Sequence, residues 1–452
     1  MVRCTRPRSL CGSLVICLLV TLPLITKVLN GTRGYELLDP RIEPEGRRLS
    51  DDVPHEGTCS TFAAGVMENV TIVLKMGAGE VSVRLPAYLN RLGRRCKQDM
   101  LLFSDRRAQY DGLEIHDALA NLRPEYRHNN PDFELHDASH QLADNKEVEG
   151  KSRKGWRLDK YKFLPMMELT RHLRPKSHWF VFIELDTYVN WDNMHRFLAR
   201  FDPMTPYYFG SPVWPYKKPV FAHGGTGFVL STAALDKLVV RGSMFARDKH
   251  EDKHYVPGTH LFGRDMTSEC CGDEVLASVL KESGVGLRGY WPMFNGEKPT
   301  TARFGREQWC EAILTLHHLG LEDFSDLDRW ETSSRRDPSK PLTFEELFTF
   351  VEPSIRDRLD DWTNLSEDLA YYGGDAGKSF DACLTACEKN KKCLQFEHFG
   401  HSCRLSYDIR LGHRQLPDGG KRWTSGWLRD RIQAFKARHS PCDGAHIVHA
   451  NP

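Results

Sequence analysis

The chain has 452 residues, enough to bury one large domain and a smaller one, since a single core stops growing at roughly 250–300 residues. With 27% charged and 40% hydrophobic residues its composition is that of an ordinary globular protein. The formal net charge of +1, without a long basic face carrying interleaved aromatic residues, argues against nucleic acid as a partner.

The N-terminus has the features of a membrane anchor. Arg3, Arg6 and Arg8 precede a charge-free run over residues 9–26, about the shortest length that can cross a bilayer. The arginines favour a cytoplasmic tail at 1–8 and a single-pass, type II orientation with the rest of the chain in a lumen. No small-x-small cleavage pattern follows, so a signal anchor in the Golgi or ER membrane is predicted, with cleavage and secretion as the alternative.

Cysteine usage agrees with a lumenal location. Ten of the thirteen cysteines follow the apolar run. An even number in an oxidising compartment indicates disulfides, although the pairing cannot be deduced from the spacing. Three N-x-[ST] sequons, opened by Asn30, Asn69 and Asn364, are compatible with the same compartment.

The predicted elements begin after a polar stretch at 27–65, which we interpret as a stem. Residues 70–81, VTIVLKMGAGEV, are expected to form a buried strand broken by glycines, and a helix-like segment and the apolar run DMLLFSD follow. Residues 156–173 have apolar residues at helical spacing and lead into a further strand, WFVFIELDTYVNW at 179–191. This alternation predicts an α/β domain over 66–335 with a parallel sheet and crossover helices.

Two carboxylates close the strand at 179–191. Residues i and i+2 of a strand share a side, so Glu184 and Asp186 are expected to face together. Adjacent carboxylates without a partner would repel each other, and a hard divalent cation that also binds substrate phosphates removes this problem. The alternative is a strand end whose acids face solvent or pair with arginines.

The order of motifs around this pair resembles the fringe-like and core-1 β1,3-galactosyltransferase-like glycosyltransferases of family 31, in particular fungal members. Residues 70–105 resemble the opening of that family, ELDTYV its D-x-D-T-Y-V motif, and HGGTGFVLS its G-G-A-G-[FY] loop. CGDEVLA resembles its E-D-V segment, and TLHHL its late histidine. The resemblance implies a GT-A fold, a Rossmann-like mixed sheet with flanking helices that binds a nucleotide sugar.

The implied activity is the inverting, metal-dependent transfer of a hexose from a UDP-sugar to a glycan or glycoprotein. Galactose is the favoured hexose and β1,3 the favoured linkage. In this family Asp186 would be the main ligand of Mn²⁺ or Mg²⁺, with Glu184 supporting it directly, through water or at the ribose. His317 matches the family's metal-binding histidine. His318 is expected to face the opposite way, as neighbours on a strand do.

The glycine-rich loop and two later acids complete the implied site. Gly224, Gly225 and Gly227 allow close approach of the backbone to a ligand, or they form a plain β-turn. Asp273 and Glu274 are jointly the candidates for the general base that takes the proton of the acceptor hydroxyl. The alternative for both acids is a helix N-terminus, where negative charge is favourable, and the two interpretations are compatible.

Five further residues are predicted on the nucleotide side of the site because they end strands or precede the metal strand. For the two lysines an ordinary solvated side chain is the alternative. These residues are Lys75, Gly77, Asp105, Asp159 and Lys160.

The C-terminal part is cysteine-dense. After a predicted helical linker at 336–365, residues 366–445 contain a C-x₃-C-x₅-C pattern that resembles the PAN/apple module. Cys383 and Cys387 lie one helical turn apart and suit two bridges to neighbouring strands, with Phe396 in the core. Such modules bind proteins or glycans; the alternatives are a purely stabilising role and a zinc site, which a lumen disfavours.

Two other functions remain open for the whole chain. Glu at position 184 and the swapped order of the acids at 273–274 are compatible with an inactive relative that acts as a lumenal chaperone or glycan-binding protein. An adhesin that works through its C-terminal module is the other.

Overall fold

The computed structural model describes residues 67–92, 97, 100–133, 153–250, 254–335, 337 and 340–451. The predicted cytoplasmic tail, signal anchor and stem, at 1–8, 9–26 and 27–65, lie outside these ranges. Among the described residues, no helix combines the length and the apolar character that crossing a membrane requires.

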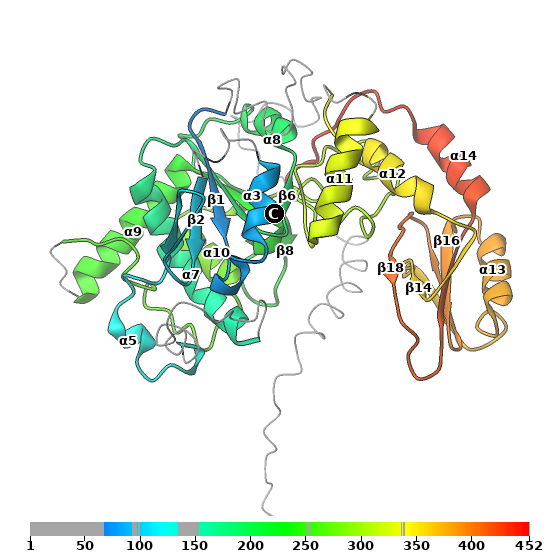
Figure 1. Cartoon of the computed structure of the whole chain (residues 1–452), viewed down its shortest axis with the longest axis horizontal. Coiled ribbons are helices and arrows are strands. Elements are labelled where there is room, and N and C mark those ends of the chain that lie inside the picture. Colours follow the sequence, from blue (N-terminus) through cyan, green and yellow to red (C-terminus); the bar gives the residue numbers. More distant parts are fainter. Residues whose placement is uncertain are drawn as a thin grey trace, which may run out of the picture. The chain divides into compact units, whose positions relative to one another are not determined.

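A mixed eight-stranded sheet forms the centre of the large domain (Figure 1). Its strand order is β11-β7-β10-β5-β1-β2-β4-β3. The strands at the centre are parallel, whereas β10 runs antiparallel to both of its neighbours, so the sheet is mixed, as the family resemblance implied. The bounds are β1 (Val70–Lys75), β2 (Met100–Ser104), β3 (Ala108–Tyr110), β4 (Leu113–Asp117), β5 (Trp179–Glu184), β7 (Tyr208–Gly210), β10 (Phe228–Ser231) and β11 (Leu287–Gly289).

Helices cover both faces of this sheet, and the predicted α/β class with flanking helices is therefore confirmed (Figure 1). Side chains alternate along β5: Phe180 and Phe182 join the core beneath α7 (Arg153–Leu173), α9 (Thr232–His250) and α10 (Gly272–Glu282). Val181 and Ile183 join the opposite core. That core includes α3 (Leu85–Arg91), α8 (Trp191–Leu198), α11 (Leu321–Ser333) and α12 (Phe344–Val351).

Short elements complete the large domain. They are α5 (Pro124–Arg127), β6 (Tyr188–Val189), β8 (Pro212–Val213), β9 (Phe221–Ala222), β12 (Thr315–Leu316) and the 3-10 helices η1 (Ala78–Glu80), η2 (Pro131–Phe133), η3 (Gly224–Thr226) and η4 (Glu352–Ser354).

The pairing of two of these short strands positions the site. β6 follows β5 directly and pairs antiparallel with β12, Tyr188 opposite Leu316. Because the partners run in opposite directions, the residues before Tyr188 lie beside those after Leu316. Asp186 and His317 are thus brought together, and the backbone N–H of Leu319 donates to the carbonyl of Asp186 at 3.1 Å.

The C-terminal part forms a five-stranded antiparallel sheet in the order β13-β19-β16-β17-β15, with α13 (Phe380–Lys389) against it. Phe396 is buried there, as predicted. The bounds are β13 (Arg358–Asp360), β15 (Leu369–Tyr372), β16 (Gln395–Phe399), β17 (Ser402–Ser406), β19 (Trp423–Trp427), the separate pair β14 (Trp362–Thr363) and β18 (His413–Arg414), and the last helix α14 (Arg429–His439).

The predicted helical linker at 336–365 is only partly helical. It contains α12 and η4, but also β13, which is an edge strand of the five-stranded sheet, and β14. The sheet thus begins before the predicted module boundary at 366. Strands of two and three residues are too short to show a period-two pattern, so β13 and β14 could not be predicted from the sequence.

Three disulfides join described cysteines: Cys383–Cys403, Cys387–Cys393 and Cys310–Cys442. The first ties α13 to β17, as expected for a bridge from this helix to a strand. Cys387 instead bonds to Cys393, which lies just before β16. The third links the segment before β12 to the segment after α14 across 132 residues.

Candidate active site

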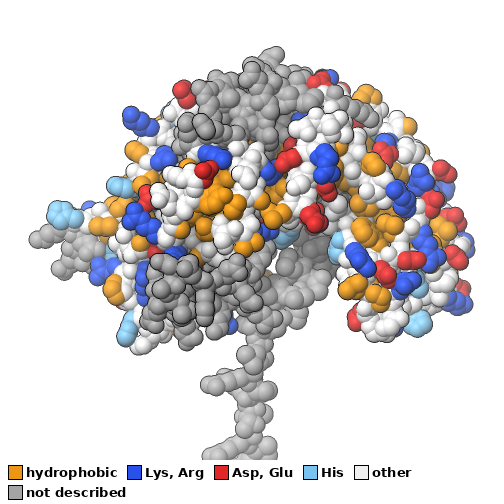
Figure 2. Space-filling view, viewed as in Figure 1, with side chains coloured by type: hydrophobic (Ala, Val, Ile, Leu, Met, Phe, Trp, Pro, Cys, Tyr) orange, Lys and Arg blue, Asp and Glu red, His pale blue; other side chains and the backbone are white. Residues whose placement is uncertain are grey.

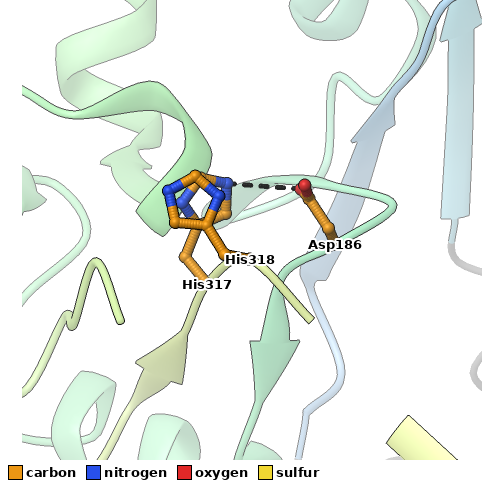
Figure 3. A group of neighbouring side chains, drawn as sticks. All are labelled: Asp186, His317 and His318. Carbon is orange, nitrogen blue, oxygen red and sulfur yellow. Dashed lines mark ion pairs between the residues drawn. The ribbon is translucent and has the colours of Figure 1, made fainter. Parts of the chain in front are cut away.

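Three potential metal ligands converge at the end of β5. One ligand atom from each of Asp186, His317 and His318 lies within 4.8 Å of the other two, and the two imidazoles face the carboxylate of Asp186 (Figure 3). Nε2 of His317 is 3.3 Å from Oδ1 of Asp186. Asp186 and His317 are buried, whereas His318 is exposed.

The prediction that His318 points away from this group is wrong. It assumed a continuous strand, but β12 ends at Leu316, and His318 has a left-handed φ of 64°. The two imidazole rings consequently lie side by side, with centroids 3.9 Å apart. The rule that neighbouring side chains point to opposite sides does not apply to His317 and His318, because the strand has already ended at Leu316.

Glu184 is not part of this convergent group. Its Oε1 lies 3.0 Å from Nζ of Lys75, the residue opposite it in the β1–β5 ladder. Lys75 is buried and is also 2.6 Å from Oδ2 of Asp159. The lysine therefore balances the charge of Glu184, and the geometry favours an indirect role for Glu184 over direct metal ligation.

Lys75 belongs to a buried charge network that the sequence predicted only in part. Nζ of Lys162 lies 2.9 Å from Oδ1 of Asp159 and 3.6 Å from Oδ1 of Asp105, and it donates to the carbonyl of Met76 at 3.0 Å. Burial lowers the pKa of Lys75, but the carboxylates of Asp159 and Glu184 outweigh it and raise that pKa above its usual range. Lys75 and Lys162 are therefore charged, and the carboxylates of Asp105, Asp159 and Glu184 around them offset their two positive charges.

Lys160 lies outside this network. Its Nζ is 3.1 Å from Oδ2 of Asp132 and 3.4 Å from the carbonyl of Glu269. Lys162 takes the place predicted for Lys160. The signal for it was available in the sequence, because Lys162 follows Asp159 by three residues on α7 and shares its face.

Gly77 and Asp105 lie next to one another after β1 and β2. The N–H of Gly77 donates to Glu80 at 3.0 Å, and the N–H of Ala78 donates to Oδ1 of Asp105 at 2.9 Å. Both predicted residues therefore belong to the same strand-end region as Lys75. Arg84, which was not predicted, lies 3.8 Å from Oδ2 of Asp186 and 3.2 Å from Glu80.

The glycine loop at 223–227 connects the metal-ligand group to α10. A Cβ on Gly225 would lie 2.3 Å from Cε1 and Nε2 of His317, so only glycine leaves room for the imidazole. The N–H of Gly224 donates to Oδ2 of Asp273 at 2.9 Å. Gly227 has a φ of 76°, a conformation that glycine adopts without strain.

His223 opens this loop and was not predicted as a site residue. Its Nδ1 accepts from the N–H of Thr226, and its ring centroid is 5.4 Å from that of His317. Burial lowers the pKa of His223, although the nearby carboxylate of Asp273 acts in the opposite direction. The loop therefore presents a neutral imidazole between Asp273 and the metal-ligand group.

The two candidate bases have different environments. Both lie in the first turn of α10, in agreement with the helix N-terminus considered above. Glu274 is buried and pairs with Lys218, which also lies 3.1 Å from Glu269. Asp273 faces the glycine loop through Gly224.

A divalent cation fits the residues present. Nδ1 of His317 is buried and has no hydrogen-bond partner among the described residues. Two imidazoles and a carboxylate form a mixed nitrogen and oxygen donor set, which suits Mn²⁺ better than Mg²⁺.

Part of the candidate site lies in a segment that is similar to known proteins. Residues 131–257 match the model of the Fringe-like family. This Fringe-like segment contains β5, Asp186 and the glycine loop, whereas Asp273, His317 and His318 lie beyond it.

A second similarity is to the glycoprotein-N-acetylgalactosamine 3-beta-galactosyltransferase 1 of Xenopus laevis, 39% identical over 64 residues. The alignment spans 14% of this chain and only 18% of that protein. Both similarities support a glycosyltransferase.

Proposed function

We propose that the chain is a metal-dependent, inverting glycosyltransferase that moves a hexose, in the first place galactose, from a UDP-sugar to a hydroxyl of a glycan or glycoprotein. The β1,3 linkage and the galactosyl donor rest on the printed activity of the Xenopus relative. The observation that carries the proposal is the convergence of Asp186, His317 and His318 beside a glycine loop that also holds Asp273.

In this proposal Asp186, His317 and His318 hold Mn²⁺, which would neutralise charge on the diphosphate leaving group. Lys75 and Lys162 hold the carboxylates of Asp105, Asp159 and Glu184 in place on the side of the site proposed for the donor nucleotide.

Asp273 accepts the proton of the acceptor hydroxyl as that oxygen attacks the anomeric carbon. Its orientation toward the glycine loop favours it over Glu274, whose carboxylate is occupied by Lys218.

The remaining assignments belong to the same proposal. The large domain has the GT-A type of nucleotide-sugar fold, and the five-stranded sheet with α13 is an apple-like module, supported by the disulfides Cys383–Cys403 and Cys387–Cys393. The disulfides also support an oxidising compartment. We propose that the protein lies in the Golgi or ER lumen and is anchored in the membrane through residues 9–26. We also assign it to the fungal type of family 31.

A panel of nucleotide sugars tests this function. UDP release from UDP-galactose and other UDP-hexoses is measured with glycan acceptors, with Mn²⁺ and after chelation by EDTA. We expect release that requires Mn²⁺ and is fastest with UDP-galactose. Absence of release with every donor, together with retained glycan binding, would favour the inactive relative instead.

A further inference from the structure

Two adjacent cysteines lie just before α10 and take no part in the disulfides described above. Cys270 is exposed and Cys271 is partly exposed, and their Sγ atoms are 3.0 Å apart. The disulfide cysteines of the C-terminal module, Cys383–Cys403 and Cys387–Cys393, are in contrast fully buried. Cys310 and Cys442 are partly exposed but already form a disulfide, so Cys270 and Cys271 are the accessible thiols among the described cysteines.

The two thiols differ in reactivity. The thiol of Cys271 donates to Sγ of Cys270, and this hydrogen bond lowers the pKa of Cys270 to about 7, while burial and the carboxylates of Glu274 and Asp273 oppose the shift. The same interaction raises the pKa of Cys271. Since the thiolate is the nucleophile in disulfide exchange, Cys270 is the residue that attacks and Cys271 the one that resolves.

We propose that Cys270 and Cys271 form a thiol–disulfide exchange site that takes a low-molecular-weight disulfide and closes to a vicinal disulfide. The Cys270 thiolate attacks one sulfur of the small disulfide, whose S–S bond breaks and releases one thiolate. Cys271 gives its proton to that thiolate and attacks Sγ of Cys270, which expels the second small thiolate. The second small thiolate takes up from solvent the proton that Cys270 released on ionising, so in sum the small disulfide gains two electrons and two protons and becomes two thiols, while the cysteine pair becomes a disulfide.

The position of the pair couples it to the candidate base. Cys271 is the N-cap of α10, and Gly272 follows in a space without room for a side chain: a Cβ there would lie 2.2 Å from Phe163 and 2.9 Å from the carbonyl of Lys160. Ring closure shortens the S–S distance from 3.0 Å to about 2.05 Å. Because Gly272 cannot move toward Phe163, we expect the change to reach Asp273 and its contact with Gly224.

The exchange site is tested on the full chain by incubation with oxidised glutathione, rapid alkylation and peptide mass mapping. In the wild type, the peptide holding both cysteines should lose two alkylatable thiols without gaining glutathione. Cys271→Ser should stop at a mixed disulfide on Cys270. Cys270→Ser should react about tenfold more slowly, because burial and the carboxylates of Asp273 and Glu274 still raise the pKa of the remaining thiol of Cys271. The disulfides Cys310–Cys442, Cys383–Cys403 and Cys387–Cys393 serve as internal controls that must remain intact.

A wild-type protein that keeps both thiols, or that accumulates the mixed disulfide, would overturn the proposal. The link to catalysis rests on the proposed function and is measured separately as UDP release before and after oxidation. We expect oxidation to lower kcat in the wild type and not in Cys270→Ser. A protein that forms the vicinal disulfide but has no transferase activity would support the exchange site and refute the proposed function. An active transferase whose cysteines stay reduced would support the proposed function and refute the exchange site.

Discussion

Gly225 sets the position of His317 at the scale of single residues. The space that a Cβ would fill is occupied by the imidazole of His317. The loop cannot retreat, because Oγ1 of Thr187 donates to the carbonyl of Gly225 at 2.8 Å and ties it to the turn that carries Asp186. A side chain at 225 must therefore displace the histidine.

We predict that Gly225→Ala lowers the affinity for Mn²⁺ by about tenfold or more, the scale on which outer contacts orient metal ligands. Isothermal titration calorimetry with Mn²⁺ in the presence of UDP measures the effect. Gly286→Ala is the matched control, because nothing lies within 4 Å of the Cβ it would add. Equal Mn²⁺ affinities of the two variants would show that Gly225 does not determine the position of His317.

Single residues of the site were predictable where a motif is short and local. Asp186 and His317 came from such motifs, and the structure brings them together. His318 was misplaced because the end of a two-residue strand leaves no mark in the sequence. Lys162 was missed although its spacing of three residues from Asp159 indicates a shared face of α7, whereas its proximity to Asp105 depends on the tertiary structure.

At the scale of elements, the N-terminus of α10 gives Asp273 and Glu274 different partners, whereas the sequence could not distinguish the roles of these two acids. We predict that Asp273→Asn lowers kcat by about a hundredfold or more, as expected for loss of a general base, with little change in melting temperature. Glu274→Gln should lower kcat less, since its carboxylate is held by Lys218.

Steady-state kinetics and thermal unfolding of both variants measure this difference. Glu282→Gln, an exposed acid at the other end of the same helix, is the control for a change of charge on α10. A larger loss of kcat in Glu274→Gln than in Asp273→Asn would reverse the assignment of the base.

Helix α7 carries a buried acid, Glu168, that forms no ion pair with a lysine or arginine among the described residues. Oε2 of Glu168 accepts from the N–H of Gly258 at 2.8 Å, and burial raises the pKa of Glu168 from 4.5 to about 7. The folded protein therefore binds this proton more tightly than the unfolded chain does. Its contribution to stability is complete below pH 4.5 and is lost as the pH rises through about 7.

We predict that Glu168→Gln removes this dependence, so that from pH 4.5 to pH 8 the wild type loses about 3 kcal/mol of unfolding free energy more than the variant does. Urea unfolding of both proteins at several pH values measures the difference in their unfolding free energies. The contributions of all other titrating groups cancel in this difference. Glu322→Gln, an exposed acid on α11, is the control and should follow the wild type. Parallel curves for wild type and Glu168→Gln would contradict the assignment.

At the scale of the whole molecule, Cys310–Cys442 joins the segment before His317 and His318 to the chain after α14. Backbone pairing continues next to it, since the N–H of Ala312 donates to the carbonyl of His446 at 2.9 Å. The loop closed by this disulfide is long, with a sequence separation of 132, whereas Cys387–Cys393 closes a separation of 6.

Loop-closure entropy predicts that replacing both Cys310 and Cys442 by Ala costs about 5 kcal/mol, against about 2 kcal/mol for the same change at Cys387 and Cys393. Chemical unfolding of the two double variants under non-reducing conditions measures the costs. The reverse order would show that the long bridge does not restrain the unfolded chain.

The general architecture was predictable from the sequence, because the apolar runs of the central strands and the cysteine spacing are strong local patterns. The early start of the five-stranded sheet at β13 was not, since edge pairing depends on tertiary contacts, and the mixed character of the large sheet followed only from the family resemblance. On the face drawn in Figure 2, basic and acidic side chains are interspersed, in line with the net charge of +1.

The central claim is that Asp186, with His317 and His318, holds a divalent cation together with a UDP-sugar. Electron paramagnetic resonance of Mn²⁺, titrated with UDP, counts the bound ion without requiring turnover. We predict one bound Mn²⁺ per chain in the wild type and in Asp326→Asn, an exposed acid on α11, and loss of that binding in Asp186→Asn. An Asp186→Asn protein that binds Mn²⁺ and UDP as tightly as the wild type would contradict the account.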